Sequence, residues 1–296
     1  MKSPIQRNTL KKLISASFIL PSMIGFLVFY VSPTIQGFIL GFTDWDLLSK
    51  TKFIGLKNFT EILTDRDFWN SMNVTLVYVL WNVPIQTVLA LCIALIMDRV
   101  TKSIIMRGIL LIPWILSNVV VALLWLWMLD SSIGIINELL RFAGIKPVHF
   151  LTTTQLALPS IAGINIWRHM GYTALLVFAG LQGVPKELEE AAIMDGAGSS
   201  RKFFSIIIPY IRPVLAFVII TSVAGSFQVY DTVAIITKGK GGPVDSTNVI
   251  NLYIYKNGFE SYRMGYASAT SIILFAILLG VSVIQMKFMK ANEADA

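Results

Sequence analysis

Cysteine and histidine are nearly missing from this sequence. Its 296 residues hold one cysteine, Cys92, and two histidines, His149 and His169. A single cysteine cannot form an intrachain disulfide and supplies no cysteine-ligated metal site. The two histidines are twenty residues apart and have no paired carboxylates nearby. We therefore predict neither a disulfide framework nor a metal site.

Charged side chains are also scarce. They make up 14% of the chain, against roughly a quarter in an ordinary soluble domain. Hydrophobic residues make up 55%, and the mean hydropathy is +0.70. This composition excludes an ordinary soluble globule and indicates an integral membrane protein.

The apolar residues stand in long blocks. A helix needs about 20 apolar residues to cross the hydrocarbon core of a bilayer. Four blocks of this length contain no formal charge, and two more contain one charge each, Arg168 and Asp231. We predict an all-α protein with six transmembrane helices. The uncharged blocks are residues 13–43, 71–97, 108–129 and 264–286, and the other two are 156–183 and 213–237.

These blocks define one membrane domain over residues 13–290, with an N-terminal tail at 1–12 and a C-terminal tail at 291–296. Lys11 and Lys12 precede the first block as they would in a signal peptide. The block is longer than the apolar region of a signal peptide, however, and no A-x-A cleavage site follows it. We expect it to be retained as the first span.

The distribution of lysine and arginine predicts the orientation, because basic residues concentrate in cytoplasmic loops. On the side that holds both termini, the tails and loops carry thirteen basic and seven acidic residues; the opposite side has longer loops and carries ten of each, when Asp231 near the outer end of its span is counted with it. Both termini are therefore expected in the cytoplasm. The thirteen basic residues are Lys2, Arg7, Lys11, Lys12, Arg99, Lys102, Arg107, Lys186, Arg201, Lys202, Arg212, Lys287 and Lys290.

The net charge of +7 follows from these loops, so it is explained by topology rather than by nucleic-acid binding. The sequence has no nucleophile–base pattern, no metal-ligand set and no Walker A sequence. We predict no catalytic residue and no ATP site, which argues against a membrane-embedded enzyme.

Several polar residues lie inside the predicted spans. A charged side chain costs about 2.5–3.5 kcal/mol at the bilayer centre, so it usually faces a cavity or a partner. Arg168 either lines a solute path or pairs internally in a tilted helix, and Asp231 either lines the path or reaches water. The uncharged residues either bind solute or join helices. The eight candidate path residues are Asn82, Gln86, Asn118, Asn165, Arg168, Gln228, Tyr230 and Asp231.

Tryptophan and glycine in the spans have simpler interpretations. Trp114, Trp125 and Trp127 are expected at the membrane interface or facing lipid, with stacking on a sugar as the alternative. Four glycines are expected to allow helices to approach closely. These are Gly171, Gly180, Gly265 and Gly280.

The longest cytoplasmic loop, residues 183–212, predicts two short helices joined by an elbow. Pro185 suits the first helical position, and the acids that follow it complement the helix dipole. Gly196 is a natural C-terminal stop. Ser199 or Ser200 can cap a second helix that ends toward Pro209. Such a pair either fits a groove on another protein or is a solvated loop.

The residues of this loop favour the first alternative. Glu190-Ala191-Ala192-x-x-Asp195-Gly196-Ala197, followed by Phe203 and Pro209, resembles the "EAA" signature of permease subunits of binding-protein-dependent ABC importers. Residues 53–59, 67–75, 180–188, 229–243 and 252–255 resemble the carbohydrate-type permeases. The resemblance covers nearly the whole chain and is to the maltose F-type and glycerol-3-phosphate A-type subunits. The enteric maltose subunit's two extra N-terminal spans and large outer domain are missing, and Lys238-Gly239-Lys240 departs from the usual glycine run.

The resemblance implies a permease subunit in the cytoplasmic membrane of a bacterium or archaeon. It implies a second, related permease, two copies of an ATPase subunit, an extracytoplasmic binding protein and a carbohydrate as solute. ATP and Mg²⁺ would be bound by the ATPase subunit and no cofactor by this chain. Residues 190–192, 195–197, Phe203 and Pro209 would dock on the ATPase. A stand-alone secondary transporter or channel is the alternative; it would need inverted repeats or several coupling carboxylates inside the membrane.

Overall fold

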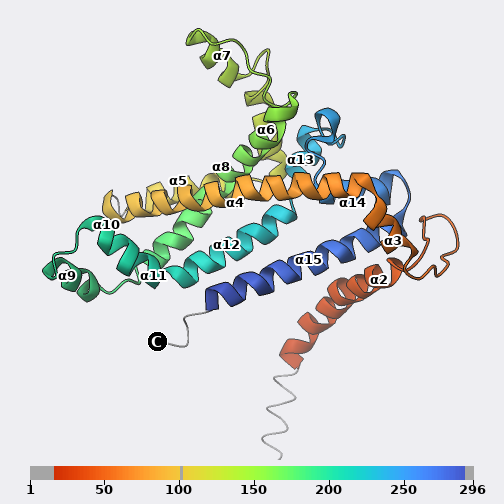
Figure 1. Ribbon diagram of the computed structural model, residues 1–296, viewed down its shortest axis with the longest axis horizontal. Coiled ribbons are helices and arrows are strands. Elements are labelled where there is room, and N and C mark those ends of the chain that lie inside the picture. Colours follow the sequence, from red (N-terminus) through yellow and green to blue (C-terminus); the bar gives the residue numbers. More distant parts are fainter. Residues whose placement is uncertain (1–16, 101–102, 291–296) are drawn as a thin grey trace, which may run out of the picture. The chain divides into compact units, whose positions relative to one another are not determined.

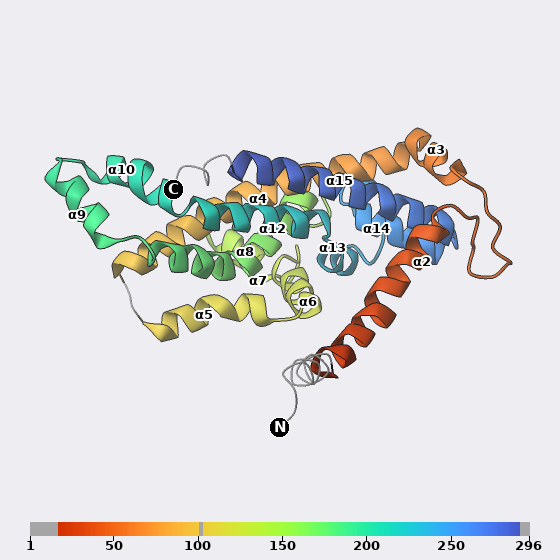
Figure 2. The same ribbon diagram turned by 90° about the horizontal axis from the view of Figure 1, so that it is seen from below.

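Figures 1 and 2 show a computed structural model of the chain, which describes residues 17–100 and 103–290. The predicted tails, 1–12 and 291–296, and the start of the first span lie outside the described residues. The chain forms two compact units. One runs up to Thr64 and includes Asn257–Leu274, and the other is Asp65–Lys256 with the chain from Phe275 on.

The described residues are almost entirely helical, which confirms the all-α fold class. Among them, the one β contact is an isolated bridge between Thr43 and Phe53. The helices are η1 (Leu27–Val31), α2 (Ser32–Leu40), α3 (Lys57–Thr64), α4 (Arg66–Val100), α5 (Ile104–Ile115), α6 (Asn118–Met128), α7 (Ile135–Phe142), α8 (Thr154–Leu181), α9 (Lys186–Met194), α10 (Ser199–Lys202), η2 (Phe203–Ile207), α11 (Ile208–Tyr210), α12 (Arg212–Phe227), α13 (Asp231–Ile236), η3 (Pro243–Asp245), α14 (Ile250–Tyr255), η4 (Lys256–Glu260) and α15 (Met264–Lys290).

Within residues 17–100 and 103–290, four helical stretches are long and apolar enough to cross a membrane: Ser17–Leu40, Arg66–Asp98, Arg212–Ile236 and Met264–Phe288. The pair α5 and α6 passes the same test but bends by 91°, so it is either a fifth, broken span or a re-entrant segment. The sequence predicted one uninterrupted span here. Hydropathy gives the length of an apolar block but not the bend of its backbone, so the sequence did not predict this break.

The predicted fourth span corresponds to α8, which has 28 residues. Its length is enough to cross the hydrocarbon core. Asn165, Arg168 and His169 make its centre polar, and it is not among the helices that are apolar throughout. Six spans therefore remain a prediction, of which the structure supports four or five.

In the second unit, α8 packs against α4, α5 and α12 (Figures 1 and 2). Two predicted glycines make this possible. A Cβ at Gly171 would lie 1.9 Å from the carbonyl oxygen of Leu110 on α5, and one at Gly180 would lie 2.9 Å from Val214 on α12. Close helix approach is thus confirmed at both positions. Gly280 has no described atom within 4 Å of a Cβ, so that expectation is wrong within this chain.

Buried apolar side chains gather at two levels of this bundle. One cluster includes Val74, Ile161 and Val233, and the other includes Met97, Val177 and Ile211. On each of α4, α8 and α12, polar residues lie between the two levels. The bundle therefore has apolar ends and a polar middle.

Two helix breaks occur at this middle level. Leu116 and Ser117 are extended between α5 and α6, and the Ser117 hydroxyl oxygen accepts a hydrogen bond from the Val120 amide, which caps α6. Gln228 to Tyr230 separate α12 from α13. Beyond the first break, α6 and α7 project away from the bundle of α4, α8 and α12 (Figure 1).

The loop around α7 is internally ordered. The buried Asn137 side chain donates to the carbonyl oxygens of Asp130 and Val148 and accepts from the Val148 amide at 2.7 Å. Backbone N–H groups of Ile133 and Ser132 donate to the Asp130 carboxylate and hold the pKa of Asp130 below its ordinary value. This loop is therefore a built structure rather than a linker.

The first unit joins its outer loop to the start of α15. Asn58 is buried and donates to the carbonyl oxygens of Gly41 and Thr43 at 3.0 and 2.8 Å. A Cβ at Gly265 would lie 2.0 Å from the Thr43 carbonyl oxygen, and the Gly265 amide donates to Trp45. The close approach predicted for Gly265 is confirmed.

Candidate functional site: a polar cavity and a cytoplasmic loop

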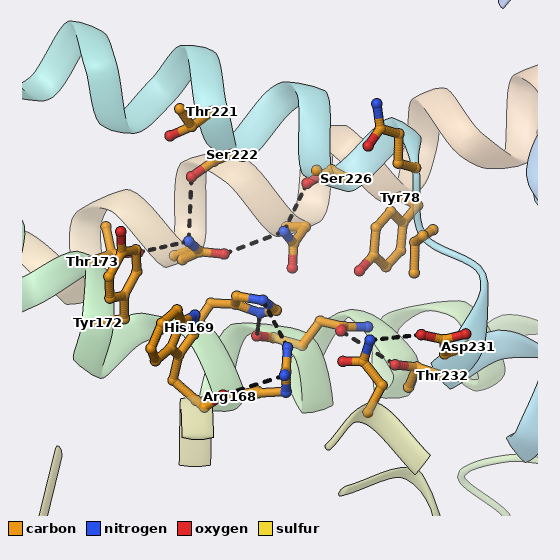
Figure 3. A pocket seen from close by; sticks show the side chains of 18 of the residues that line it. Tyr78, Arg168, His169, Tyr172, Thr173, Thr221, Ser222, Ser226, Asp231 and Thr232 are labelled. Carbon is orange, nitrogen blue, oxygen red and sulfur yellow. Dashed lines mark hydrogen bonds between the residues drawn. The ribbon is translucent and has the colours of Figure 1, made fainter. Parts of the chain in front are cut away.

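A cavity of about 290 Å³ lies at the polar middle of the second unit. Figure 3 shows side chains from α4, α8, α12 and α13 converging on it. All eight candidate path residues line it. The sequence identified each one separately as a polar group within a span, and the fold brings them to one place. Their role as a path is untested.

Two amides from α4 join the helices at one wall of the cavity. The Gln86 amide nitrogen donates to Thr173 on α8 at 2.9 Å and to Ser222 on α12 at 3.3 Å. The Asn82 amide nitrogen donates to Ser226 on α12 at 2.9 Å and to Gln86 at 3.3 Å. The Asn82 side-chain oxygen is buried without a partner among the described residues. This wall keeps one acceptor unsatisfied.

Arg168 lies against the break between α5 and α6. Its Nη2 donates to the carbonyl oxygens of Trp114 at 3.3 Å and Leu116 at 3.0 Å. Its Nη1 lies 3.0 Å from His169 Nε2, and His169 Nδ1 lies 2.9 Å from the Asn165 carbonyl oxygen. Because a guanidinium only donates, His169 Nε2 accepts and its ring proton is on Nδ1. The imidazole is therefore neutral in this arrangement.

A second polar contact joins the starts of α6 and α13. The Asn118 amide nitrogen donates to Asp231 Oδ2 at 2.7 Å. No ion pair of Asp231 with a basic group within 4 Å occurs in the described part of the chain. The second carboxylate oxygen of Asp231 is thus available to a hydroxyl donor in the cavity.

An aromatic pair forms part of the wall. The rings of Trp114 and Tyr172 stack with centroids 4.4 Å apart and planes 8° apart. Trp125 packs edge-on against Trp167 inside the chain, whereas Trp127 is exposed. Trp114 is 40% exposed although it also lines the cavity, so an interfacial or lipid-facing ring stays a prediction for Trp114 and Trp127. Trp125 is half-buried against Trp167 and departs from that expectation.

Sequence reasoning missed the other polar residues of the cavity. Serine and threonine are common on transmembrane helices, and a single one carries little signal. A spacing of four residues was the available clue, since it puts Ser222 and Ser226 on one face of α12. The missed lining residues with polar side chains are Tyr78, His169, Tyr172, Thr173, Thr221, Ser222, Ser226 and Thr232.

The cytoplasmic loop contains the predicted helix–elbow–helix. Helix α9 ends in a turn where the Ala197 amide donates to Ala192 and the Gly196 amide to Ile193, which is a Schellman motif. Gly196 has φ +75°, so it ends α9 in the left-handed conformation, which confirms it as the C-terminal stop. Pro185 is the N-cap of α9 rather than its first residue, and Gly198 rather than a serine caps α10.

The second half of the loop differs from the prediction. A short helix ending toward Pro209 was expected, but α10, η2 and α11 follow one another without a gap, and only Ile211 separates them from α12. Phe203 and Ile207 pack in the apolar cluster of α4 and α8. A displacement of the loop would therefore reach α12 directly, and with it two serines of the cavity.

The outward face of the loop combines charge and apolar surface. Glu190, Ala191, Asp195, Gly196 and Pro209 are exposed, Ala197 and Phe203 are half-buried, and Ala192 is buried beneath them. Lys202 Nζ on α10 binds Glu189 on α9 at 2.6 Å. Sequence reasoning missed the large apolar side chains exposed here, which are Leu188, Ile193, Met194 and Phe204.

Comparison with known proteins decides the family. The family model of the inner membrane component of binding-protein-dependent transport systems matches residues 74–289, which contain both the cavity and the loop. The chain belongs to this family. It is a transmembrane permease subunit of an ABC importer, and a transporter or channel that works alone is set aside.

Individual proteins resemble nearly the whole chain. The probable ABC transporter permease protein YesP of Bacillus subtilis is 36% identical over 275 residues, covering 92% of this chain and 88% of its own. The trehalose/maltose transport system permease protein MalF of Thermococcus litoralis is 33% identical over 271 residues, 91% of each chain. A bacterial ABC transporter that imports the acidic polysaccharide alginate has the same fold, with a TM-score of 0.83 at 23% identity over 98% of this chain and 100% of its own.

Proposed function

We propose that this chain forms, with a second permease, the translocation path for a carbohydrate delivered by an extracytoplasmic binding protein. The observation that supports it best is the polar cavity at the middle of an otherwise apolar bundle. Amide, hydroxyl and carboxylate groups beside stacked aromatic rings can bind a polyhydroxylated solute. The trehalose/maltose permease among the relatives favours the same solute class.

The eight residues named from the sequence would line the path of the solute through this cavity. The unpartnered oxygen of Asn82 and the open oxygen of Asp231 accept from hydroxyl groups. Gln228 and Tyr230 come from the break before α13 and add donors and acceptors at one end. In secondary transporters, solute sites commonly lie at discontinuous helices, and this cavity likewise lies beside two helix breaks.

The cytoplasmic loop would dock on the ATPase subunit. Its exposed carboxylates, Glu190 and Asp195, and the apolar residues beside them suit a groove with a basic group and an apolar floor. The partner, present in two copies, would bind and hydrolyse ATP with Mg²⁺, while this chain binds no cofactor and catalyses no reaction. Movement would pass through the helical segment 199–227 to the cavity.

Placing this loop at the ATPase fixes the orientation of the chain. Both termini would then lie in the cytoplasm, as the lysine and arginine distribution predicts. The chain would be a multi-pass protein of the inner membrane, and the loops that hold α7 and α3 would face the binding protein.

The test is ATP hydrolysis by the complete transporter in proteoliposomes. We expect hydrolysis to rise when the binding protein is loaded with trehalose, maltose or a longer oligosaccharide. Glu190→Ala should lower the amount of ATPase that co-purifies, because it leaves a basic group of the partner unpaired. The matched control is Glu187→Ala on the same helix. Stimulation by amino acids but by no carbohydrate would refute the solute class, and full retention of the ATPase in Glu190→Ala would refute this docking contact.

A further inference from the structure

The helix break between α5 and α6 leaves backbone carbonyl groups without helical partners at the level of the cavity. The last carbonyl groups of any helix have no N–H donor within that helix, and the bilayer core supplies no water to replace it. At the end of α5, the Ile112 carbonyl oxygen accepts locally from the Leu116 amide at 3.3 Å. The Trp114 and Leu116 carbonyl oxygens accept from Arg168 instead.

The charge of Arg168 suits this position for a second reason. The C-terminal end of a helix carries partial negative charge, which a cation stabilises. Arg168 points at the end of α5, and both N–H groups of its Nη2 are used there. Its Nε is buried without a partner among the described residues, which leaves one N–H of the guanidinium unsatisfied inside the protein. The guanidinium is mostly committed to the protein.

Neighbouring contacts hold Arg168 in this orientation. Gly171 lies three residues on, on the same face of α8, and lets α5 approach to contact. Tyr172, four residues on, stacks on the ring of Trp114. The carbonyl oxygen of the same Trp114 accepts a hydrogen bond from Arg168. His169 accepts from Nη1 and is itself fixed by the Asn165 carbonyl oxygen. The contacts form one assembly between α8 and the end of α5.

We propose that Arg168 is a positioning residue that holds the break between α5 and α6, and so sets the wall of the cavity, rather than a residue that binds solute. The inference rests on the proposed function only in taking this cavity as the solute's. It assigns the intramembrane arginine to internal pairing across helices. It also explains why a charge is retained in α8 without a carboxylate partner within 4 Å.

The experiment is hydrogen–deuterium exchange on the assembled transporter in lipid nanodiscs, without solute. In Arg168→Met, amide exchange in the peptide spanning residues 112–121 should rise about tenfold or more, the factor expected from losing hydrogen bonds to a charged donor. Arg168→Lys should stay close to wild type, because an ammonium can still donate to the end of α5. Arg168→Gln, which donates without charge, should fall between them.

The matched control is Arg141→Met, which removes an arginine that donates to the Ser132 carbonyl oxygen outside the cavity. It should leave the 112–121 peptide unchanged. Should Arg168→Met fail to assemble, the comparison of lysine with glutamine decides. Wild-type exchange in Arg168→Met, or equal exchange in the lysine and glutamine variants, would overturn the proposal. Because no solute is added, this result is independent of whether the transported solute is a carbohydrate.

Discussion

Gly196 is the residue whose backbone most directly shapes the cytoplasmic loop. Its φ of +75° lies in the left-handed region, and no other described atom lies within 4 Å of a Cβ placed on it. A side chain here would meet no neighbour in this chain. Its cost would be conformational, about 1–2 kcal/mol for an ordinary residue and more for a β-branched one.

We predict that Gly196→Val loosens the elbow between α9 and α10 and reduces the ATPase that co-purifies with the permease pair. Gly198→Val is the matched control, since Gly198 also has open space but an ordinary φ of −68°. The measurement is ATPase stoichiometry after detergent extraction. Equal retention in both variants would show that the left-handed turn is not needed for docking.

Residue identity alone predicted Gly196 well but Arg168 incompletely. A glycine between an acidic helix start and a serine pair is most simply a helix C-terminal stop, so its role at the end of α9 could be inferred from the sequence. An arginine inside a span has several possible roles, because a guanidinium can pair with solute, with a carboxylate or with the backbone. The deciding fact is the helix break at Leu116, which the hydropathy pattern does not contain.

At the scale of elements, the two halves of the loop are joined by one ion pair. Glu189 on α9 and Lys202 on α10 lie 2.6 Å apart, and their side chains are 35% and 20% exposed. Partly exposed pairs of this kind contribute about 0.2–1 kcal/mol. This contribution to the free energy of folding is small, but the ion pair directly fixes the position of α9 relative to α10.

Charge reversal tests this contact. Glu189→Lys and Lys202→Glu should each reduce the ATPase retained by the permease, because like charges would face each other across the elbow. The double exchange should restore much of the loss. Retention that falls further in the double variant than in either single one would mean that each residue acts on the partner instead.

Elements were predicted well where apolar length decides them. The spans around residues 71–97 and 264–286 match α4 and α15 because a long uncharged block has no other stable form in a membrane. The third and fifth spans were predicted without their breaks. Pro113 precedes the first break, but proline is tolerated in membrane helices and did not mark the site uniquely.

The cavity was predictable only as a set of separate residues. Each amide or charged side chain in a span had two possible interpretations: it contacts solute, or it contacts another helix. The structure shows that several do join helices, as Gln86 does with Thr173 and Ser222. That the same groups surround one cavity depends on the crossing of α4, α8 and α12, which one sequence does not specify.

For the whole molecule, the orientation in the membrane is the first consequence to test. Single cysteines replacing Lys50 and Lys256 should react with a membrane-impermeant thiol reagent in intact cells, and one replacing Arg201 should react only after lysis. Cys92 is exposed in this chain and must first be changed to serine. Reaction at position 201 in intact cells would reverse the proposed topology.

The central claim is that solute passes through the polar cavity, and filling it tests this most directly. Gly225 lines the cavity and has no other described atom within 4 Å of a Cβ, so a leucine side chain would enter the open space. Gly163 has the same freedom on α8 but does not line the cavity, and serves as the matched control. The measurement is carbohydrate uptake by proteoliposomes of the complete transporter at equal permease content. We expect Gly225→Leu to reduce uptake to background while Gly163→Leu transports; wild-type uptake by Gly225→Leu would contradict the account.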